Sequence, residues 1–323
     1  MTEAPALACP ARLSFARRHP IPPPSAPSRI DMISPVTVRK TALGLIYALT
    51  EHGESPDTFD YATHWELALE TERDRYRKAL AKAILHATRQ NGDLMRLLEQ
   101  RITDAIGTLR GDLTAAPLRE ELEGYLSRAL AFDAALKALR FSLGDKRRDG
   151  TEQLALCCGD CLTLAATLSQ MADSLQTQLS DRPDYRRVLD PVGTALRRQL
   201  PLLETCCRLR DPATLAGDAQ YAAFATAAEQ LRELPKQAED YARSVLKHRE
   251  RFDEKIAPVL LHYTTERLDV IDRCILYIAL YEMTVRGLNV PIVVSEATSL
   301  AHEYSGSKSA PFIHGIISAL ARH

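Results

Sequence analysis

Residues 268–282 read LDVIDRCILYIALYE, and they decide the fold class of this chain. Asp269 is a typical helix N-cap, because its carboxylate can accept a hydrogen bond from a free amide of the first turn. Asp272 falls in that turn, where the positive end of the helix dipole stabilises an acid. Apolar residues then recur at the spacing of one helix face: Ile271, Ile275 and Ile278. The stretch therefore predicts an amphipathic helix.

The neighbouring segments carry the same kind of signal. Pro291 suits the first turn of a helix and Gly306 suits its end. Ser309 is expected to cap a last helix with an apolar face that includes Phe312, Ile313 and Ile316. Upstream, residues 238–261 are expected to form one helix that Pro258 kinks or ends.

A further helix is expected at residues 34–53. Ser34 is a suitable N-cap, Pro35 fits the first helical position, and Gly53 is a plausible C-terminal stop. Apolar residues repeat between them at helical spacing: Val38, Ala42, Leu45 and Leu49.

The segment before this helix, residues 1–33, holds seven prolines. Proline cannot continue a helix, and the segment lacks the apolar periodicity needed to fold, so we expect a disordered arm. Met32 stands directly before the first helical signal, and a native start at Met32 is a hypothesis.

Composition predicts an all-α, cytoplasmic protein. Only 14 of 323 residues are glycine, and strong helix formers dominate. We find no apolar run close to the ~18 residues that a membrane span needs, and the N-terminus lacks the apolar core of a secretory signal. The formal net charge of -1 provides no global attraction to nucleic acid, so a nucleic-acid site would need a local basic patch.

The long central stretch, residues 54–235, has turn signals that separate five or six expected amphipathic helices. Cys158 and Cys161 have the spacing of a zinc or redox pair, which Cys206 and Cys207 could complete. We favour a core role, because Cys157 and Cys161 would share one helix face and buried cysteine behaves as a small hydrophobe. The metal alternative stays open here. We find no catalytic motif and expect neither enzymatic activity nor a cofactor.

Residues 268–282 resemble the signature of the NusB family of transcription antitermination factors, in which an acidic segment introduces a helix ending in Ala-x-Tyr-Glu. The resemblance continues in order through three further stretches: Asn289–Pro291, Ser295–Gly306 and Phe312–Ile316. Arg39–Tyr47 is similar to the first helix of the family.

Members of the family are about half as long as this chain. The resemblance therefore implies a NusB-like helical bundle that is split by a long helical insertion. We expect a disordered arm at residues 1–33, the first helix of the NusB-like domain at 34–53, the insertion at 54–235 and the remainder of the domain at 236–323. An insertion of roughly 150 to 180 residues is long enough to form a domain of its own.

The resemblance implies binding to boxA-like single-stranded nascent RNA, together with a small-subunit ribosomal protein and the transcription elongation complex. The family's RNA contacts map onto the first helix and the start of the last one. Arg39, Lys40 and Lys308 are expected to meet phosphates, and Tyr47 and Phe312 are expected to stack on unpaired bases. Burial is an equally plausible role for Phe312.

The sequence departs from the family pattern at positions where the family has residues that favour RNA binding. Only Arg39 and Lys40 stand where the family has several basic residues, and Pro311 and His314 replace residues of its last motif. The alternative is therefore a non-enzymatic protein-interaction scaffold in which the insertion is the binding element and RNA binding is weak or lost. A related module precedes the catalytic domain of certain ribosomal RNA methyltransferases, but the chain has no stretch long enough for that domain after the motif.

Overall fold

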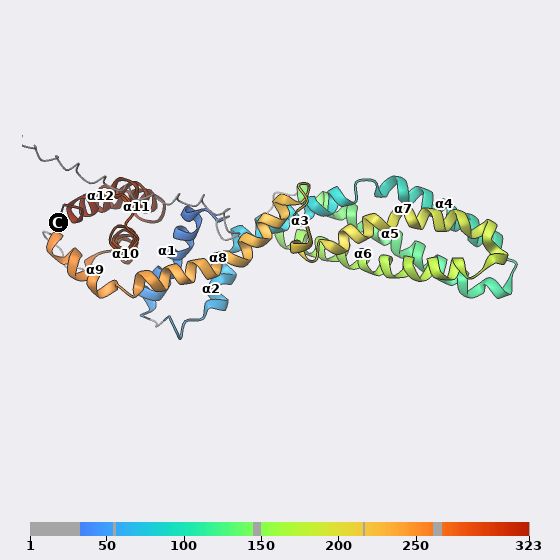
Figure 1. The fold of residues 1–323 in the computed structure, drawn as a ribbon, viewed down its shortest axis with the longest axis horizontal. Coiled ribbons are helices and arrows are strands. Elements are labelled where there is room, and N and C mark those ends of the chain that lie inside the picture. Colours follow the sequence, from blue (N-terminus) through green and yellow to red (C-terminus); the bar gives the residue numbers. More distant parts are fainter. Residues whose placement is uncertain (1–32, 54–55, 145–149, 216, 261–266, 323) are drawn as a thin grey trace, which may run out of the picture. The chain divides into compact units, whose positions relative to one another are not determined.

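The computed structural model describes residues 33–53, 56–144, 150–215, 217–260 and 267–322, and the regular elements in these ranges are helices. The prediction of an all-α fold is therefore confirmed for the described part of the chain. Figure 1 shows the helices in chain order, which are α1 (Pro35–His52), α2 (Tyr61–Ala68), α3 (Glu70–Ala87), α4 (Asn91–Leu109), α5 (Ala116–Gly144), α6 (Gly150–Ser180), α7 (Arg186–Arg208), α8 (Ala222–Leu246), α9 (Arg249–Ile256), α10 (Val270–Thr284), α11 (Val290–Tyr304) and α12 (Ser309–Leu320). The predicted arm, except Ile33, lies outside the described residues, and so does Met32.

Buried apolar side chains form two separate clusters. The first, which we call the terminal core, combines α1 and α2 with the second half of α8 and with α9 to α12. The second, which we call the central core, combines α3 to α7 with the start of α8. Helix α8 contributes to both, with Phe224 in the central core and Leu234 in the terminal core. Figure 1 shows α1, from the beginning of the chain, lying among the last helices.

Helix α1 has the bounds that its sequence predicts. It begins at Pro35 after Ser34 and ends before Gly53, whose φ of 63° is the left-handed conformation that glycine adopts without steric cost. Ala42, Leu45 and Leu49 are buried. The predicted apolar face therefore packs in the terminal core, against α8 and α10.

The expectation of one helix over residues 238–261 is wrong. Helix α8 ends at Leu246, two residues break the helix, and α9 begins at Arg249. After the break Phe252 and Ile256 are almost completely buried in the terminal core. We attribute the break to this burial, because hydrophobic packing outweighs the local preference for an unbroken helix. Pro258 lies in a short 3-10 turn after α9.

Helix α6 contradicts the expectation that no apolar segment is long enough to cross a membrane. By length and composition alone, its residues 151–180 are long and apolar enough to cross a membrane. One face of the helix, which includes Leu154, Cys161 and Leu168, is buried in the central core, and α6 packs against α5 and α7. A core helix of a soluble protein passes the same test, so α6 is weak evidence for a membrane span.

The cysteines of the central core are buried on helices. Cys157, Cys158 and Cys161 lie in α6 and Cys206 lies in α7. Burial raises the pKa of the Cys158, Cys161 and Cys206 thiols to about 12. Within the described ranges, no group of three or more His, Cys, Asp or Glu side chains is arranged to hold a metal ion. These cysteines therefore pack as small apolar side chains.

Candidate nucleic-acid interface

Arg39 of α1 lies at the centre of a buried polar network and is only 5% exposed. Its Nε donates a hydrogen bond to Oε1 of Glu282 at 2.9 Å, and its Nη1 donates to Oε2 of Glu296 at 2.8 Å. The hydroxyl of Tyr241 donates to the same Oε1 of Glu282 at 2.9 Å. The network therefore joins α1 to α8, α10 and α11.

Electrostatics keep Arg39 charged inside the protein. Burial alone lowers the pKa of its guanidinium, but Glu282, Tyr241 and Glu296 together outweigh burial, so the pKa is raised. Burial, together with the Glu282 carboxylate, also raises the pKa of the Tyr241 hydroxyl. The expectation that Arg39 meets RNA phosphates therefore needs correction. Two carboxylates already satisfy its guanidinium away from solvent, so Arg39 is a positioning residue for α1.

The exposed face of α1 carries the other two predicted residues of this helix. Lys40 and Tyr47 are seven residues apart and so lie on the same side of the helix. Tyr47 is 39% exposed. The Nζ of Lys40 lies 2.5 Å from Oε2 of Glu303, near the end of α11, and both side chains are partly exposed. This ion pair places the exposed face of α1 beside the segment that leads into α12.

The start of α12 carries the remaining two predicted residues. Lys308 is exposed and occupies the N-cap position, so Ser309 is the first helical residue and not the cap that the sequence predicted. Phe312 is half-buried and packs against the terminal core. Part of its side chain therefore remains accessible to solvent.

The connection between α11 and α12 is fixed by a buried acid. The Ser305 hydroxyl donates to Oδ1 of Asp272 at 2.7 Å and lies 2.8 Å from the Ser309 hydroxyl. Asp272 belongs to α10 and is 7% exposed. The contact holds the N-terminus of α12, and Lys308 with it, against the terminal core.

Reasoning from the sequence did not identify the positioning roles of Glu282, Tyr241 and Asp272. A signal for Glu282 was present, because it directly follows the apolar run of α10. An acid buried at such a position must have a charged or hydrogen-bonding partner. The identity of that partner was not visible, because Arg39 is 243 residues away in the sequence.

In a comparison with known protein families, residues 214–322 match the model described as the NusB family. The chain carries a NusB-family domain. It is similar to proteins named "Transcription antitermination protein NusB" from Solibacter usitatus (35% identical over 83 residues), Carboxydothermus hydrogenoformans (35% over 85) and Clostridium botulinum (38% over 84). These alignments cover 24–26% of this chain and 57–59% of the relatives. No solved structure matches the chain.

The NusB-family match contains most of the buried polar network. Glu282, Glu296, Tyr241 and Asp272 all fall within residues 214–322. Helix α1 lies outside the match. It is connected to the matched segment by the ion pairs of Arg39 with Glu282 and Glu296, by the ion pair of Lys40 with Glu303, and by the packing of its apolar face. The structure thus brings α1 and the matched segment into one hydrophobic core.

Proposed function

We propose that this chain is an RNA-binding transcription antitermination factor of the NusB type. It would bind boxA-like nascent RNA together with a small-subunit ribosomal protein, act in the cytoplasm and have no enzymatic activity. The observation that carries the proposal is the match of residues 214–322 to the NusB family. The exposed α1 face and the start of α12 supply suitable side chains for the contact.

The proposed RNA contacts are Lys40, Tyr47, Lys308 and Phe312. Lys308 stands at the N-terminus of α12, where its ammonium adds to the positive end of the helix dipole and so favours a phosphate. The exposed Tyr47 ring and the half-buried Phe312 ring would stack on unpaired bases. Arg39 contributes by holding α1 in place through its buried ion pairs.

The terminal core supports a modified division of the chain. Trp65 and Leu69, which follow α1, are buried in the terminal core. The Nε1 of Trp65 also donates to Oε1 of Glu239 in α8 at 2.7 Å. We therefore propose that the NusB-like domain comprises residues 33–69 and 234–322, so that the inserted helices begin after Leu69 and not at residue 54.

The test is fluorescence anisotropy with a labelled boxA-like RNA and a scrambled control, with and without the small-subunit ribosomal protein, over a salt series. We expect preference for the boxA-like RNA and weaker binding by Lys308→Glu. Loss of one phosphate contact should lower the salt slope by about 0.7. Lys255→Glu, a charge reversal at an exposed position of α9, is the matched control and should bind like the wild type. Equal affinity for both RNAs in both conditions would refute the proposal.

Exposed apolar side chains in the inserted helices favour a second candidate function. Phe141 of α5 is 75% exposed and Leu156 of α6 is 63% exposed. Such residues are enriched at protein interfaces when they form a patch. In this alternative the chain is a non-enzymatic scaffold, its inserted helices bind a protein partner, and RNA binding is weak or lost. The same anisotropy series separates the two functions.

A further inference from the structure

A groove of about 740 Å³ lies between α3 and the first half of α8. Helix α3 lines it with Arg75, Lys78, Lys82 and His86. Its floor is made largely of small apolar side chains, with the nearly buried Phe224 of α8 among them. The groove thus combines basic side chains with an apolar floor.

No acidic side chain of the described residues balances the basic lining of this groove. Lysine and arginine total 41 and aspartate and glutamate total 42, yet no carboxylate is found among the described residues that line the groove. Lys78 and Lys82 form no ion pair within 4 Å inside the described ranges, and Arg75 has only Glu72 at 3.9 Å. These cations are therefore free to bind an anion.

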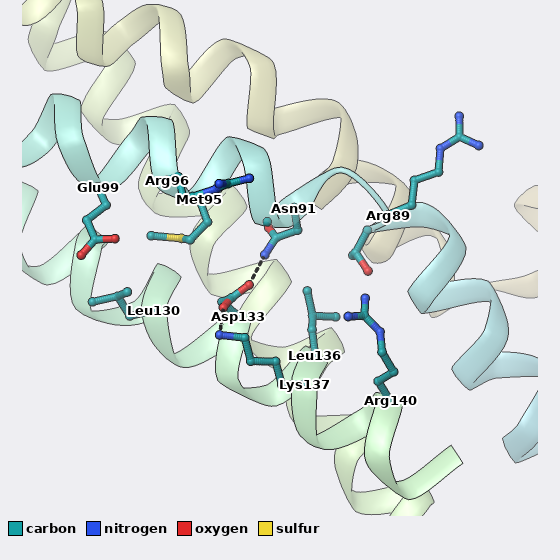
Figure 2. Close-up of a pocket in the computed structure, with 12 residues that line it drawn as sticks. Arg89, Asn91, Met95, Arg96, Glu99, Leu130, Asp133, Leu136, Lys137 and Arg140 are labelled. Atoms are coloured by element: carbon teal, nitrogen blue, oxygen red, sulfur yellow. Dashed lines mark hydrogen bonds and ion pairs between the residues drawn. The ribbon is translucent and has the colours of Figure 1, made fainter. Parts of the chain in front are cut away.

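A second cleft, between α4 and α5, shows how the chain neutralises basic residues elsewhere. In Figure 2, Asp133 lies between Asn91 and Lys137. Its Oδ2 is 2.8 Å from the Lys137 ammonium, and its Oδ1 accepts a hydrogen bond from Asn91 at 3.0 Å. Glu99 also lines this cleft. Lys137 in the second cleft therefore has an acidic partner, whereas Lys78 and Lys82 in the α3–α8 groove have none within 4 Å among the described residues.

The basic residues of α3 form a row along the helix. Positions 75, 78 and 82 follow at intervals of three and four residues, so they share one face and span about 10 Å along the axis. Such a row matches a polyanion with evenly repeated charges better than it matches a compact anion. Lysine and arginine side chains are flexible enough to follow a backbone of phosphates.

The row begins near the terminal core, because α3 starts at Glu70, directly after the buried Leu69 of that core. Tyr304, at the end of α11, is 45% exposed. Burial and the carboxylates of Glu303 and then Glu72 raise the pKa of the Tyr304 hydroxyl, because Glu72 in the first turns of α3 lies near it. Glu303 is also the partner of Lys40. Arg75 follows Glu72 by one turn, so the row leads away from the α1–α11 contact.

We propose that the α3–α8 groove binds the continuation of the single-stranded RNA beyond the segment held by α1 and α12. This inference rests on the proposed function. The three cations would contact phosphates without regard to sequence, and the apolar floor would accept a ribose or base face. The inserted helices thereby extend the bound length of RNA and compensate for the few basic residues near α1.

The experiment compares a boxA-like RNA with the same RNA extended by an unstructured stretch at its 5′ or 3′ end. The extension should tighten binding of the wild type. Lys78→Glu/Lys82→Glu should lose this gain, with a salt slope lower by about 1.4 for two contacts, while its affinity for the short RNA stays unchanged. Arg101→Glu/Arg187→Glu reverses two exposed charges on α4 and α7 and should keep the gain. Lys78→Gln/Lys82→Gln should lose part of it, which separates charge loss from misfolding.

The outcomes distinguish the two proposals. Binding of the short RNA without any gain from either extension would overturn the groove assignment and leave the proposed function intact. If the short RNA does not bind while an extended RNA still binds through Lys78 and Lys82, the proposed contacts at α1 and α12 are wrong. The assignment of the groove as an RNA site would then remain. Displacement of the extension by a polyglutamate peptide of equal charge at equal concentration would identify an acidic protein segment as the occupant and overturn the RNA assignment.

Discussion

The terminal and central cores differ in the polar groups that they bury. Arg39, Asp272 and Glu282 are the buried charged residues of the described chain, and all three lie in the helices of the terminal core. The helices of the central core bury only neutral polar residues, which are Thr88, Asn91, Ser142 and Gln199. One core is thus organised by charge pairs and the other mainly by apolar packing.

The NusB match, residues 214–322, covers α8 to α12 and so most helices of the core that holds these buried charges. A buried charge requires a partner at a defined position, so Glu282 and Arg39 restrict each other's identity. Apolar core positions accept many side chains of similar volume. The central helices can therefore be encoded by many different sequences, and few of their residues are diagnostic.

The largest loss of stability is expected for Glu282→Gln. This change removes the carboxylate between Arg39 and Tyr241 and leaves a buried guanidinium with only Glu296, so we expect a loss of about 3–5 kcal/mol. Chemical denaturation measures it. Glu303→Gln removes a partly exposed carboxylate and is the matched control, with an expected loss below about 1 kcal/mol. Equal losses for the two variants would show that the buried pair has no special role.

A smaller loss is expected for Tyr125→Phe in the central core. The Tyr125 hydroxyl donates to Oε1 of Gln199 at 2.8 Å, and both residues are almost fully buried. Its removal leaves the Gln199 oxygen without this donor, at a cost of about 1–3 kcal/mol. Hydrogen exchange should show faster opening in α5 and α7, with α1 and α10 unaffected. Equal changes in all four helices would mean that the two cores do not open separately.

The smallest effect is expected for Lys40→Ala. Its ion pair with Glu303 is partly exposed, so the loss of stability should be below about 1 kcal/mol and should vanish in 1 M salt. Thermal unfolding at low and high salt measures this. A loss as large as that of Glu282→Gln, unchanged by salt, would instead make Lys40 a structural residue and remove it from the proposed RNA contacts.

Local signals predicted the ends of several helices correctly. Asp269 caps α10, with its Oδ1 accepting a hydrogen bond from the amide of Ile271 at 3.3 Å. Gly53 ends α1 in the left-handed conformation. Each of these features depends on residues within a few positions, and so a single sequence is sufficient to reveal it.

Features that depend on distant residues were not predictable. The break between α8 and α9 is tied to the burial of Phe252 in a core built from both ends of the chain. The burial of Arg39 depends on carboxylates 243 and 257 residues away. The residues next to Arg39 in the sequence do not indicate that its side chain is buried. The candidate site was therefore predicted as a surface, but Arg39, one of its five residues, lies in the interior.

Photocrosslinking of a boxA-like RNA to the full chain, followed by mass spectrometry of the crosslinked peptides, separates the roles of the two regions. We expect crosslinks to peptides that contain Tyr47 of α1 and Phe312 of α12 with the short RNA. Additional crosslinks should appear in α3 only when the RNA is extended. Crosslinks confined to α4–α7, with α1 and α12 unmodified, would contradict the assignment of RNA binding to the NusB-family domain.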